Sequence, residues 1–176
     1  STKDEYDTDL YSDDMDYNLV EIIEAELNNY KKSFALYDFT DMIEKFIGSE
    51  LCPKFDVVFI DEAQDLSPIQ WKMYDIIKQN TKIMILAGDD DQAIYGWAGA
   101  DVQRFQEEPA KEKILPQSYR VPIRVQQVAD SIISQIDTRI MKLWNPRNEE
   151  GHCEEVYDLD EVDLTQGRWL VLARTN

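Results

Sequence analysis

Two carboxylates that follow directly on an apolar run are the first candidates for chemistry. Asp61 and Glu62 come after residues 55–60 (FDVVFI). Phosphoryl transfer needs a hard oxygen ligand for magnesium, which takes only one or two carboxylates, and a group that orients or deprotonates the attacking water. Asp61 could hold the metal, and Glu62 could act on the water. The alternative is that acids simply follow a buried strand into solvent, but the complete DEAQD at residues 61–65 favours the catalytic interpretation.

A glycine-rich stretch at residues 88–101 (GDDDQAIYGWAGAD) carries the second set of candidates. Gln92 can hydrogen-bond a phosphate or the attacking water. Tyr95 and Trp97 stand in a loop that is better suited to presenting a ring than to burying one. Stacking a base on such a ring contributes about 1–3 kcal/mol and tolerates any base. The alternative, equally favoured for Trp97 from the loop alone, is that the rings pin the loop to the core.

Tyr119 and Arg120 form the third set, between an apolar run and a proline. The tyrosine ring could stack on a nucleobase. An arginine that reaches the γ-phosphate offsets the charge that develops in the transition state, an effect of about 10³–10⁵ in rate. The alternative is that Arg120 forms an ordinary surface salt bridge.

Elements that alternate between strand and helix must position these three sets, which indicates an α/β fold with a parallel sheet. Ligands bind beyond the carboxyl ends of strands in open α/β sheets, so the three polar sets should converge on one site. We predict buried strands at residues 55–60, 82–87 and 113–115, and two later strands at 155–159 and 169–173. We predict helices at 18–31 and 38–47, one after a Ser67 N-cap with Gln70 closing a capping box, and one that starts at Pro122 and runs to Ile136. The helix after Ser67 should face the core with Ile69, Met73, Ile76 and Ile77.

The composition limits the classes of function. The net charge is −18, and residues 1–30 alone hold ten acids against one lysine. A free-standing nucleic-acid binder usually has a basic face, so DNA binding would require basic surface outside this chain or a small local patch. Cys52 and Cys153 form no disulfide framework and suit a reducing, cytoplasmic location, and His152 beside Cys153 is too little for a zinc site. No apolar run in the sequence reaches transmembrane length, which argues against a membrane partner.

Three motifs in the same order resemble motifs II, III and IV of the UvrD/Rep/PcrA superfamily-one DNA helicases. They are DEAQD at 61–65, GDDDQAIYGWAGAD at 88–101 and LPQSYRVP at 115–122. YDFTDMI at 37–43 resembles the short motif before the Walker B strand of that family, and the resemblance covers roughly residues 34–176. It implies a partial RecA-like P-loop NTPase domain plus the beginning of a second one. The implied domains are a remnant of subdomain 1B (1–33), the C-terminal part of domain 1A (34–140), and a linker with the start of domain 2A (141–176).

The resemblance also implies cofactors, a partner and roles for single residues. The cofactors are ATP and Mg²⁺, and the partner is single-stranded DNA, along which the motor would move 3′-to-5′. Asp61 would coordinate the magnesium ion, Glu62 would activate water, and Gln92 would sense the γ-phosphate. Tyr119 would stack on adenine and Arg120 would contact the γ-phosphate, while Tyr95 and Trp97 would face the DNA. The family often has arginine after the tryptophan, where this chain has Ala98, so one DNA contact of the family is missing.

The sequence contains no GxxxxGK[ST] phosphate-binding loop. We therefore expect that it is part of a longer helicase, and that these residues alone show no ATPase activity. Two alternatives stay open. One is the motor portion of an AddA/RecB-type helicase-nuclease, which a nuclease domain in the same gene would identify. The other is a non-catalytic interaction domain with a degenerate P-loop fold, which the absence of a Walker A loop from the whole gene would favour.

Overall fold

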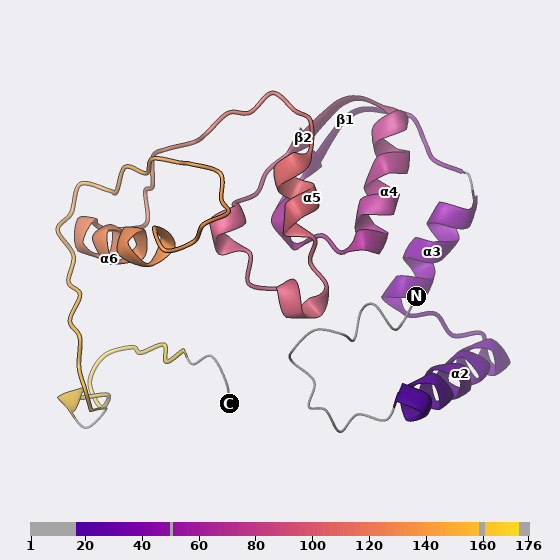
Figure 1. Cartoon of the computed structure of the whole chain (residues 1–176), viewed down its shortest axis with the longest axis horizontal. Helices are drawn as coiled ribbons and strands as arrows, with labels where there is room; N and C mark the ends of the chain where they lie inside the picture. Colours follow the sequence, from indigo (N-terminus) through magenta and orange to yellow (C-terminus); the bar gives the residue numbers. More distant parts are fainter. Residues whose placement is uncertain (1–16, 50, 159–160, 173–176) are drawn as a thin grey trace. The chain divides into compact units, whose positions relative to one another are not determined.

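The computed structural model describes residues 17–49, 51–158 and 161–172. The chain divides into two compact units, Ser1–Glu112 and Lys113–Asn176, and each is described by itself. Figure 1 traces the elements of both units along the chain.

A parallel βαβ motif forms the centre of the first unit. β1 (Phe55–Ile60) and β2 (Thr81–Leu86) are joined by α4 (Pro68–Gln79). The two strands pair in parallel, with Phe55 opposite Thr81 and Ile60 opposite Leu86. Figure 1 shows α4 running beside this strand pair. This pairing confirms the predicted α/β class and parallel sheet. The helix α4 supplies the long crossover that two parallel strands require.

The start of α4 is determined by residues next to it in sequence. The predicted capping box is present, and the Gln70 side chain accepts a hydrogen bond from the Ser67 backbone N–H at 2.8 Å. The most buried residues of α4 are not the ones that were predicted. Trp71 and Tyr74 are 3% and 2% exposed, and their rings meet edge to face with centroids 5.1 Å apart. The four predicted core residues of this helix are only half-buried: Ile69, Met73, Ile76 and Ile77.

The other predicted helices are present with shifted ends, whereas the short helix at Val102–Glu107 was not predicted. The first unit contains α2 (Tyr17–Phe34), α3 (Phe39–Ser49) and α5 (Val102–Glu107), with the short 3-10 turns η1 (Ala63–Asp65), η2 (Asp90–Gln92) and η3 (Gly96–Ala98). The second unit contains α6 (Ile123–Ile133), with Pro122 as its N-cap, so Ile136 lies beyond the helix and not on its face.

Among the described residues, no helix has both the length and the apolar character that crossing a membrane requires.

The prediction that both strands are buried is wrong for the described part of the chain. Side chains of one sheet face, such as Val58 and Met84, are half-buried, whereas on the other face Phe59 is 73% and Ile83 54% exposed. This alternation follows the two-residue period of a strand. The sheet has two strands, and the described elements cover only one of its faces.

The third predicted strand, at residues 113–115, is also wrong. These residues have no regular structure, and the nearby pairing is an isolated parallel bridge between Gln117 and Asn145. A strand needs a neighbour for its backbone groups, and Pro116 removes one donor at the end of this short run. The described parts of the two later predicted strands, 155–158 and 169–172, lack strand structure as well; Leu159 and Ala173 lie outside the described residues.

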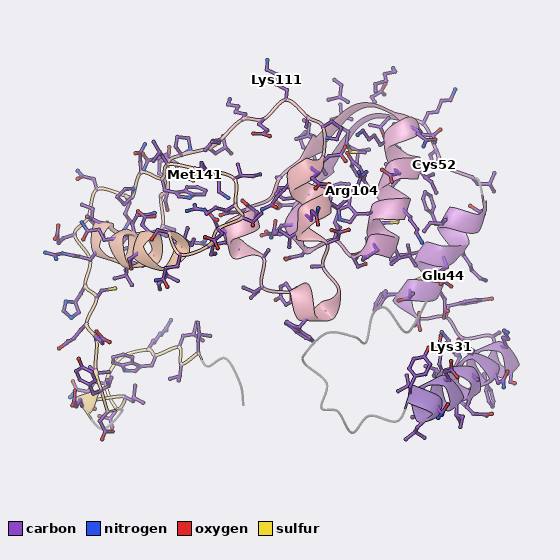
Figure 2. All side chains as sticks on the ribbon, viewed as in Figure 1. Lys31, Glu44, Cys52, Arg104, Lys111 and Met141 are labelled. Carbon is purple, nitrogen blue, oxygen red and sulfur yellow. The ribbon has the colours of Figure 1, made fainter. Side chains whose placement is uncertain are left out.

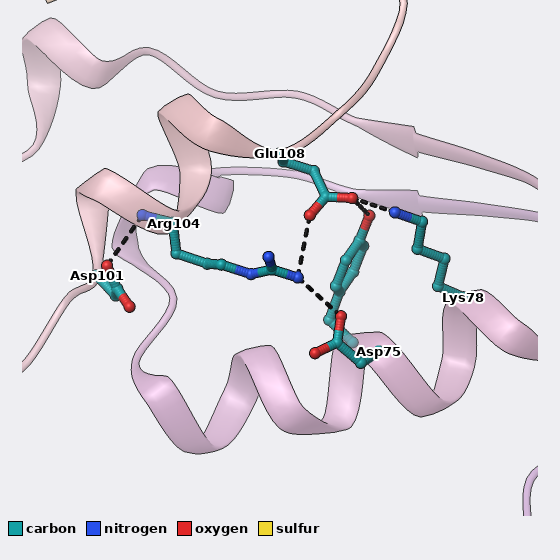
Figure 3. A network of polar contacts seen from close by, with 6 residues as sticks. Asp75, Lys78, Asp101, Arg104 and Glu108 are labelled. Atoms are coloured by element: carbon teal, nitrogen blue, oxygen red, sulfur yellow. Dashed lines mark hydrogen bonds and ion pairs between the residues drawn. The ribbon is translucent and has the colours of Figure 1, made fainter.

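Glu108, one residue beyond α5, is the centre of a polar network that joins α5 to α4 (Figure 3). Its side chain is 3% exposed and accepts a hydrogen bond from the Tyr74 hydroxyl at 2.8 Å. Lys78 pairs with one oxygen, and Arg104 pairs with the other at 3.2 Å. Arg104, labelled on α5 in Figure 2, also reaches Asp75 of α4 at 2.9 Å. A buried carboxylate is tolerated only with such partners, so the network holds the two helices in one relative position.

The network changes the acidity of its members. Burial raises the pKa of Tyr74 to about 12, and the hydrogen bond to Glu108 adds to this effect. Burial by itself would raise the pKa of Glu108, but the hydrogen bonds from Lys78 and Tyr74 outweigh it and hold the pKa below the ordinary carboxyl value. Glu108 is therefore ionised, and Tyr74 protonated, at neutral pH.

Replacing Glu108 by glutamine should lower the free energy of local opening of α4 and α5 by about 2–3 kcal/mol at pH 7, because a buried charged network loses its acceptor. Since the pKa of Glu108 is lowered in the folded state, its stabilisation is fully present above the ordinary carboxyl pKa and is lost as the pH falls through the lowered value. Hydrogen exchange of the two helices should be measured from pH 7 down to below the lowered pKa of Glu108. Over this range the free energy of local opening should fall less in Glu108→Gln than in the natural protein. The neighbouring exposed Glu107→Gln is the matched control, and equal behaviour of the two variants would contradict a stabilising network.

Candidate functional site

The two strands end at the same edge of the sheet and bring two polar loops together there. The backbone pairing continues beyond the strands, with Ala87 N–H donating to Ile60 C=O at 2.8 Å and Ala63 N–H donating to Ala87 C=O at 3.0 Å. The segment after β1 and the segment after β2 therefore run side by side. Two of the three polar sets that were predicted to converge, residues 61–65 and residues 88–92, therefore meet at this edge, since the parallel register leaves both carboxyl ends there. The third set, Tyr119 and Arg120, lies in the other unit, and its place in a common site stays a prediction.

Asp61 and Glu62 stand at this edge with exposed side chains. The Asp61 carboxylate accepts a hydrogen bond from the Glu62 backbone N–H at 3.0 Å. Glu62 has φ 52° and ψ 41°, in the left-handed region that residues other than glycine rarely adopt. Such a conformation costs on the order of 1–3 kcal/mol and is concentrated at functional sites. It turns the chain sharply out of β1 into the η1 turn.

Gln64 is a member of this site for which the sequence suggested no role. It is 1% exposed. Its amide nitrogen donates to Glu62 Oε2 at 2.9 Å and to Asp65 Oδ2 at 3.3 Å, and its amide oxygen accepts from the Asp89 backbone N–H at 3.0 Å. The only sequence signal was an amide two residues after a candidate catalytic acid, which by itself does not predict burial.

Gly88 allows the second loop to approach the first. A Cβ at this position would lie 2.7 Å from Gln64 Oε1 and 2.9 Å from Phe105 Cζ, which is too close for any side chain. The sequence predicted that the glycines of this stretch permit a tight backbone path. At Gly88 the requirement is close packing, whereas at Gly99 it is a positive φ of 85° at the end of η3.

Gln92 lies in the second loop with its amide held by a neighbour. Its Nε2 donates to Asp89 Oδ2 at 2.7 Å. Asp89, Asp90 and Asp91 also place one carboxylate oxygen each within 4.8 Å of one another. These acids are engaged within the protein, since Asp89 accepts from the Asp91 N–H at 3.2 Å and Asp90 accepts from Gln106 at 2.9 Å. Their evident effect is to shape the loop that carries Gln92.

Asp61 has the chemistry expected of a magnesium ligand. Magnesium prefers carboxylate oxygens and keeps several of its waters, so it suits an exposed carboxylate at an open edge. One Asp61 oxygen receives the Glu62 N–H, and this bond orients the carboxylate at the strand end. The residues present at this edge therefore fit the ion.

Tyr95 and Trp97 project from the loop around η3. They are 44% and 63% exposed, and their ring centroids lie 6.4 Å apart. The loop is also tied to the loop after β1 by its backbone, where Asp101 N–H donates to Leu66 C=O at 2.9 Å. Because both rings are exposed, the alternative in which they are buried against the core is wrong.

Tyr119 and Arg120 belong to the second unit. Tyr119 is 86% exposed, and Arg120 is also exposed. Within the described residues, no ion pair involves the Arg120 side chain, so the surface salt bridge considered from the sequence is not observed there.

Residues 145 and 147, in the predicted linker region, hold the loop that carries Tyr119 and Arg120. Ser118 N–H donates to Asn145 C=O at 2.8 Å, and Arg147 N–H donates to Val121 C=O at 2.9 Å. Inside the loop, the Ser118 hydroxyl accepts from Val121 N–H at 3.0 Å. Backbone bonds on both sides of residues 119–120 therefore define the path of this exposed loop.

The comparisons with known proteins agree with these motifs. Residues 2–113 match the family model described as the UvrD/REP helicase N-terminal domain. DNA helicase II of Haemophilus influenzae is 35% identical over 118 residues, which is 62% of this chain and 16% of that protein. ATP-dependent DNA helicase Rep of Buchnera aphidicola is 32% identical over 121 residues, 61% of this chain and 18% of that protein. ATP-dependent DNA helicase PcrA of Staphylococcus epidermidis is 35% identical over 111 residues, 60% of this chain and 15% of that protein.

The chain thus spans less than a fifth of the length of these relatives. The family match covers both polar loops of the sheet edge and ends at residue 113, next to the boundary between the two units. On this match, the chain belongs to the UvrD/Rep family of superfamily-one helicases, through the N-terminal domain of that family.

Proposed function

We propose that this chain is part of an ATP-dependent DNA helicase or translocase that couples Mg-ATP hydrolysis to 3′-to-5′ movement on single-stranded DNA. The observation that carries the proposal is the sheet edge where residues 61–65 and 88–92 are joined by hydrogen bonds. Ligand sites of open α/β sheets lie at this end of the strands. The names of the relatives, which are ATP-dependent DNA helicases, support the same activity.

The proposed domain organisation places this edge in a RecA-like domain. Residues 34–140 would be the C-terminal part of domain 1A, residues 1–33 a remnant of subdomain 1B, and residues 141–176 the start of domain 2A. The parallel βαβ motif supports a RecA-like domain, since such domains are built from parallel strands with crossover helices. Residues 1–16 of the 1B assignment lie outside the described part of the chain.

Each candidate residue has a proposed role in hydrolysis. Asp61 would hold the magnesium ion, which when bound neutralises charge on the phosphates. Glu62 would accept a proton from the attacking water, and Gln92 would contact the γ-phosphate. From the second unit, Tyr119 would stack on adenine and Arg120 would reach the γ-phosphate. The exposure of the Tyr119 and Arg120 side chains supports contact with a ligand.

Measurement on the full-length protein that carries this chain tests the proposal as a whole. We expect ATP hydrolysis that single-stranded DNA stimulates, and unwinding of a duplex with a 3′ single-stranded tail but not one with a 5′ tail. Unwinding only from a 5′ tail would refute the proposed direction. A purified protein that binds neither ATP nor DNA would instead indicate the non-catalytic interaction domain.

The exposed Trp97 ring is the proposed contact with DNA. Replacing it by alanine should weaken single-stranded DNA binding by about 5- to 150-fold, as expected for the loss of one stacked base, and should lower DNA-stimulated ATPase at limiting DNA accordingly. ATPase without DNA should stay unchanged. Fluorescence anisotropy with labelled oligonucleotides and steady-state ATPase measure the two effects.

Trp97→Phe is the matched variant, because it keeps a ring in the same loop. It should retain most of the DNA affinity that Trp97→Ala loses. Full DNA-stimulated ATPase in Trp97→Ala would show that the ring does not stack on DNA.

A further inference from the structure

The hydrogen bonds of Gln64 point to a role beyond the residues considered so far. The side chain is 1% exposed, and a buried amide must satisfy both its donor and its acceptor groups. Its partners come from two different loops of the sheet edge: Glu62 and Asp65 after β1, and the Asp89 backbone after β2. Gln64 is thus the side chain that links the two loops.

The partners also determine which way the amide faces. Nε2 lies 2.9 Å from Glu62 Oε2 and 3.3 Å from Asp65 Oδ2, whereas Oε1 faces the N–H of Asp89. The opposite orientation would set an oxygen against two carboxylates and an NH₂ group against an N–H. A hydrogen bond to a carboxylate is stronger than one between neutral groups, and of the two carboxylates that accept from Gln64 the Glu62 one is nearer, at 2.9 Å against 3.3 Å.

The amide cannot move away from this place, because the second loop packs on it. Gly88 approaches so closely that a Cβ there would lie 2.7 Å from Gln64 Oε1. The chain of bonds then continues to the residue proposed to sense the γ-phosphate, since Asp89 Oδ2 accepts from Gln92 Nε2 at 2.7 Å. Glu62, Gln64, Asp89 and Gln92 form one continuous hydrogen-bonded series.

We propose that Gln64 is a positioning residue for ATP hydrolysis, which holds the Glu62 carboxylate against the loop that carries Gln92. The inference rests on the proposed function, in which Glu62 activates the attacking water. Glu62 is exposed, and the hydrogen bond that its carboxylate accepts from Gln64 ties it to a buried side chain. The buried amide supplies that constraint. Orientation of a catalytic group within a narrow range contributes to rate and not to substrate affinity.

Gln64→Met in the full-length protein tests the proposal, because methionine fills similar space without a donor or acceptor. We expect a kcat for DNA-stimulated ATPase that is lower by about 10- to 100-fold, as for loss of a hydrogen bond to a charged group. The dissociation constant for a fluorescent ATP analogue should be unchanged, because the Gln64 side chain is buried and has no surface to offer a nucleotide. Gln79→Met, an exposed glutamine at the end of α4, is the matched control and should match the natural protein in both measurements.

A double-mutant cycle with Glu62→Gln separates positioning from a merely structural role. If Gln64 acts through Glu62, Gln64→Met should lower the single-turnover rate little further once Glu62 is replaced. Equal fold losses in both backgrounds, or an undiminished kcat in folded Gln64→Met, would overturn the inference. Should Gln64→Met fail to bind the analogue, Gln64→Leu takes its place in the same cycle, because it also removes the donor to Glu62 and adds no charge beside the Glu62 and Asp65 carboxylates.

Different results would reject the proposed role of Glu62 and the positioning role of Gln64. High activity of Glu62→Gln itself would reject the proposed role of Glu62. Loss of activity in Glu62→Gln, combined with equal effects of Gln64→Met in both backgrounds, would reject only the positioning role of Gln64.

Discussion

Glu62→Gln in the full-length protein is expected to lower the kcat of DNA-stimulated ATP hydrolysis by about 10²- to 10⁴-fold, the usual contribution of a general base. Glutamine has nearly the same shape, so the turn after β1 and the bond to Gln64 can be kept. It cannot accept a proton from water. Binding of ATP should therefore remain intact, and a fluorescent ATP analogue together with single-turnover hydrolysis would measure the two quantities separately.

The matched control for this change is Glu44→Gln, on the exposed surface of α3 and labelled in Figure 2. It alters the net charge by the same amount at a place remote from the sheet edge in sequence, and it should hydrolyse ATP at the natural rate. If Glu62→Gln kept more than about a tenth of the natural kcat, a loss below the lower bound for a general base, Glu62 would not be the group that activates water.

Arg120→Ala is expected to have an effect of comparable or larger size, a loss of about 10³- to 10⁵-fold in kcat. The guanidinium would stabilise charge that develops only in the transition state, so the dissociation constant for ATP should change far less than the rate. Arg120 suits this role structurally, because its side chain is exposed and the loop around it is held by backbone bonds to the segment around Asn145 and Arg147.

Arg124→Ala is the control for the loss of an arginine nearby. The Arg124 guanidinium is paired with Glu150 at 2.6 Å, and its backbone N–H, which bonds to Glu150 C=O at 2.9 Å, is retained in the variant. Its kcat should fall by much less than that of Arg120→Ala. Similar losses in the two variants would mean that Arg120 acts by holding the loop and not by reaching the nucleotide.

The elements that the sequence predicted correctly depend on near neighbours. The limits of β1 match the apolar run 55–60, and α4 begins where Ser67 and Gln70 form their capping box. These signals are local, since each involves residues within one strand or one helical turn. The predicted strand at 113–115 was wrong because its stability depends on a partner strand, which an apolar run of three residues does not specify.

The sequence predicted the part of the candidate site that follows from the order of strands and polar loops. Asp61, Glu62 and Gln92 could be placed at one sheet edge, because parallel strands followed by polar loops imply it. The roles proposed for them, and for Tyr119 and Arg120 in the second unit, remain predictions. The segment 145–150 could not be foreseen as a support for the Tyr119–Arg120 loop, because its contacts are backbone hydrogen bonds, which leave no mark in side-chain pattern.

By itself, the sequence determined the class of fold, the motifs of the family and the residues that could do chemistry. Only the tertiary structure decided which buried groups hold these residues in place. Gln64 meets Asp89 across 25 positions, and Tyr74 meets Glu108 across 34. Neither pair has a local signal, because a buried amide or carboxylate is stable only where packing brings its partner to it, and that packing is a property of the folded chain as a whole.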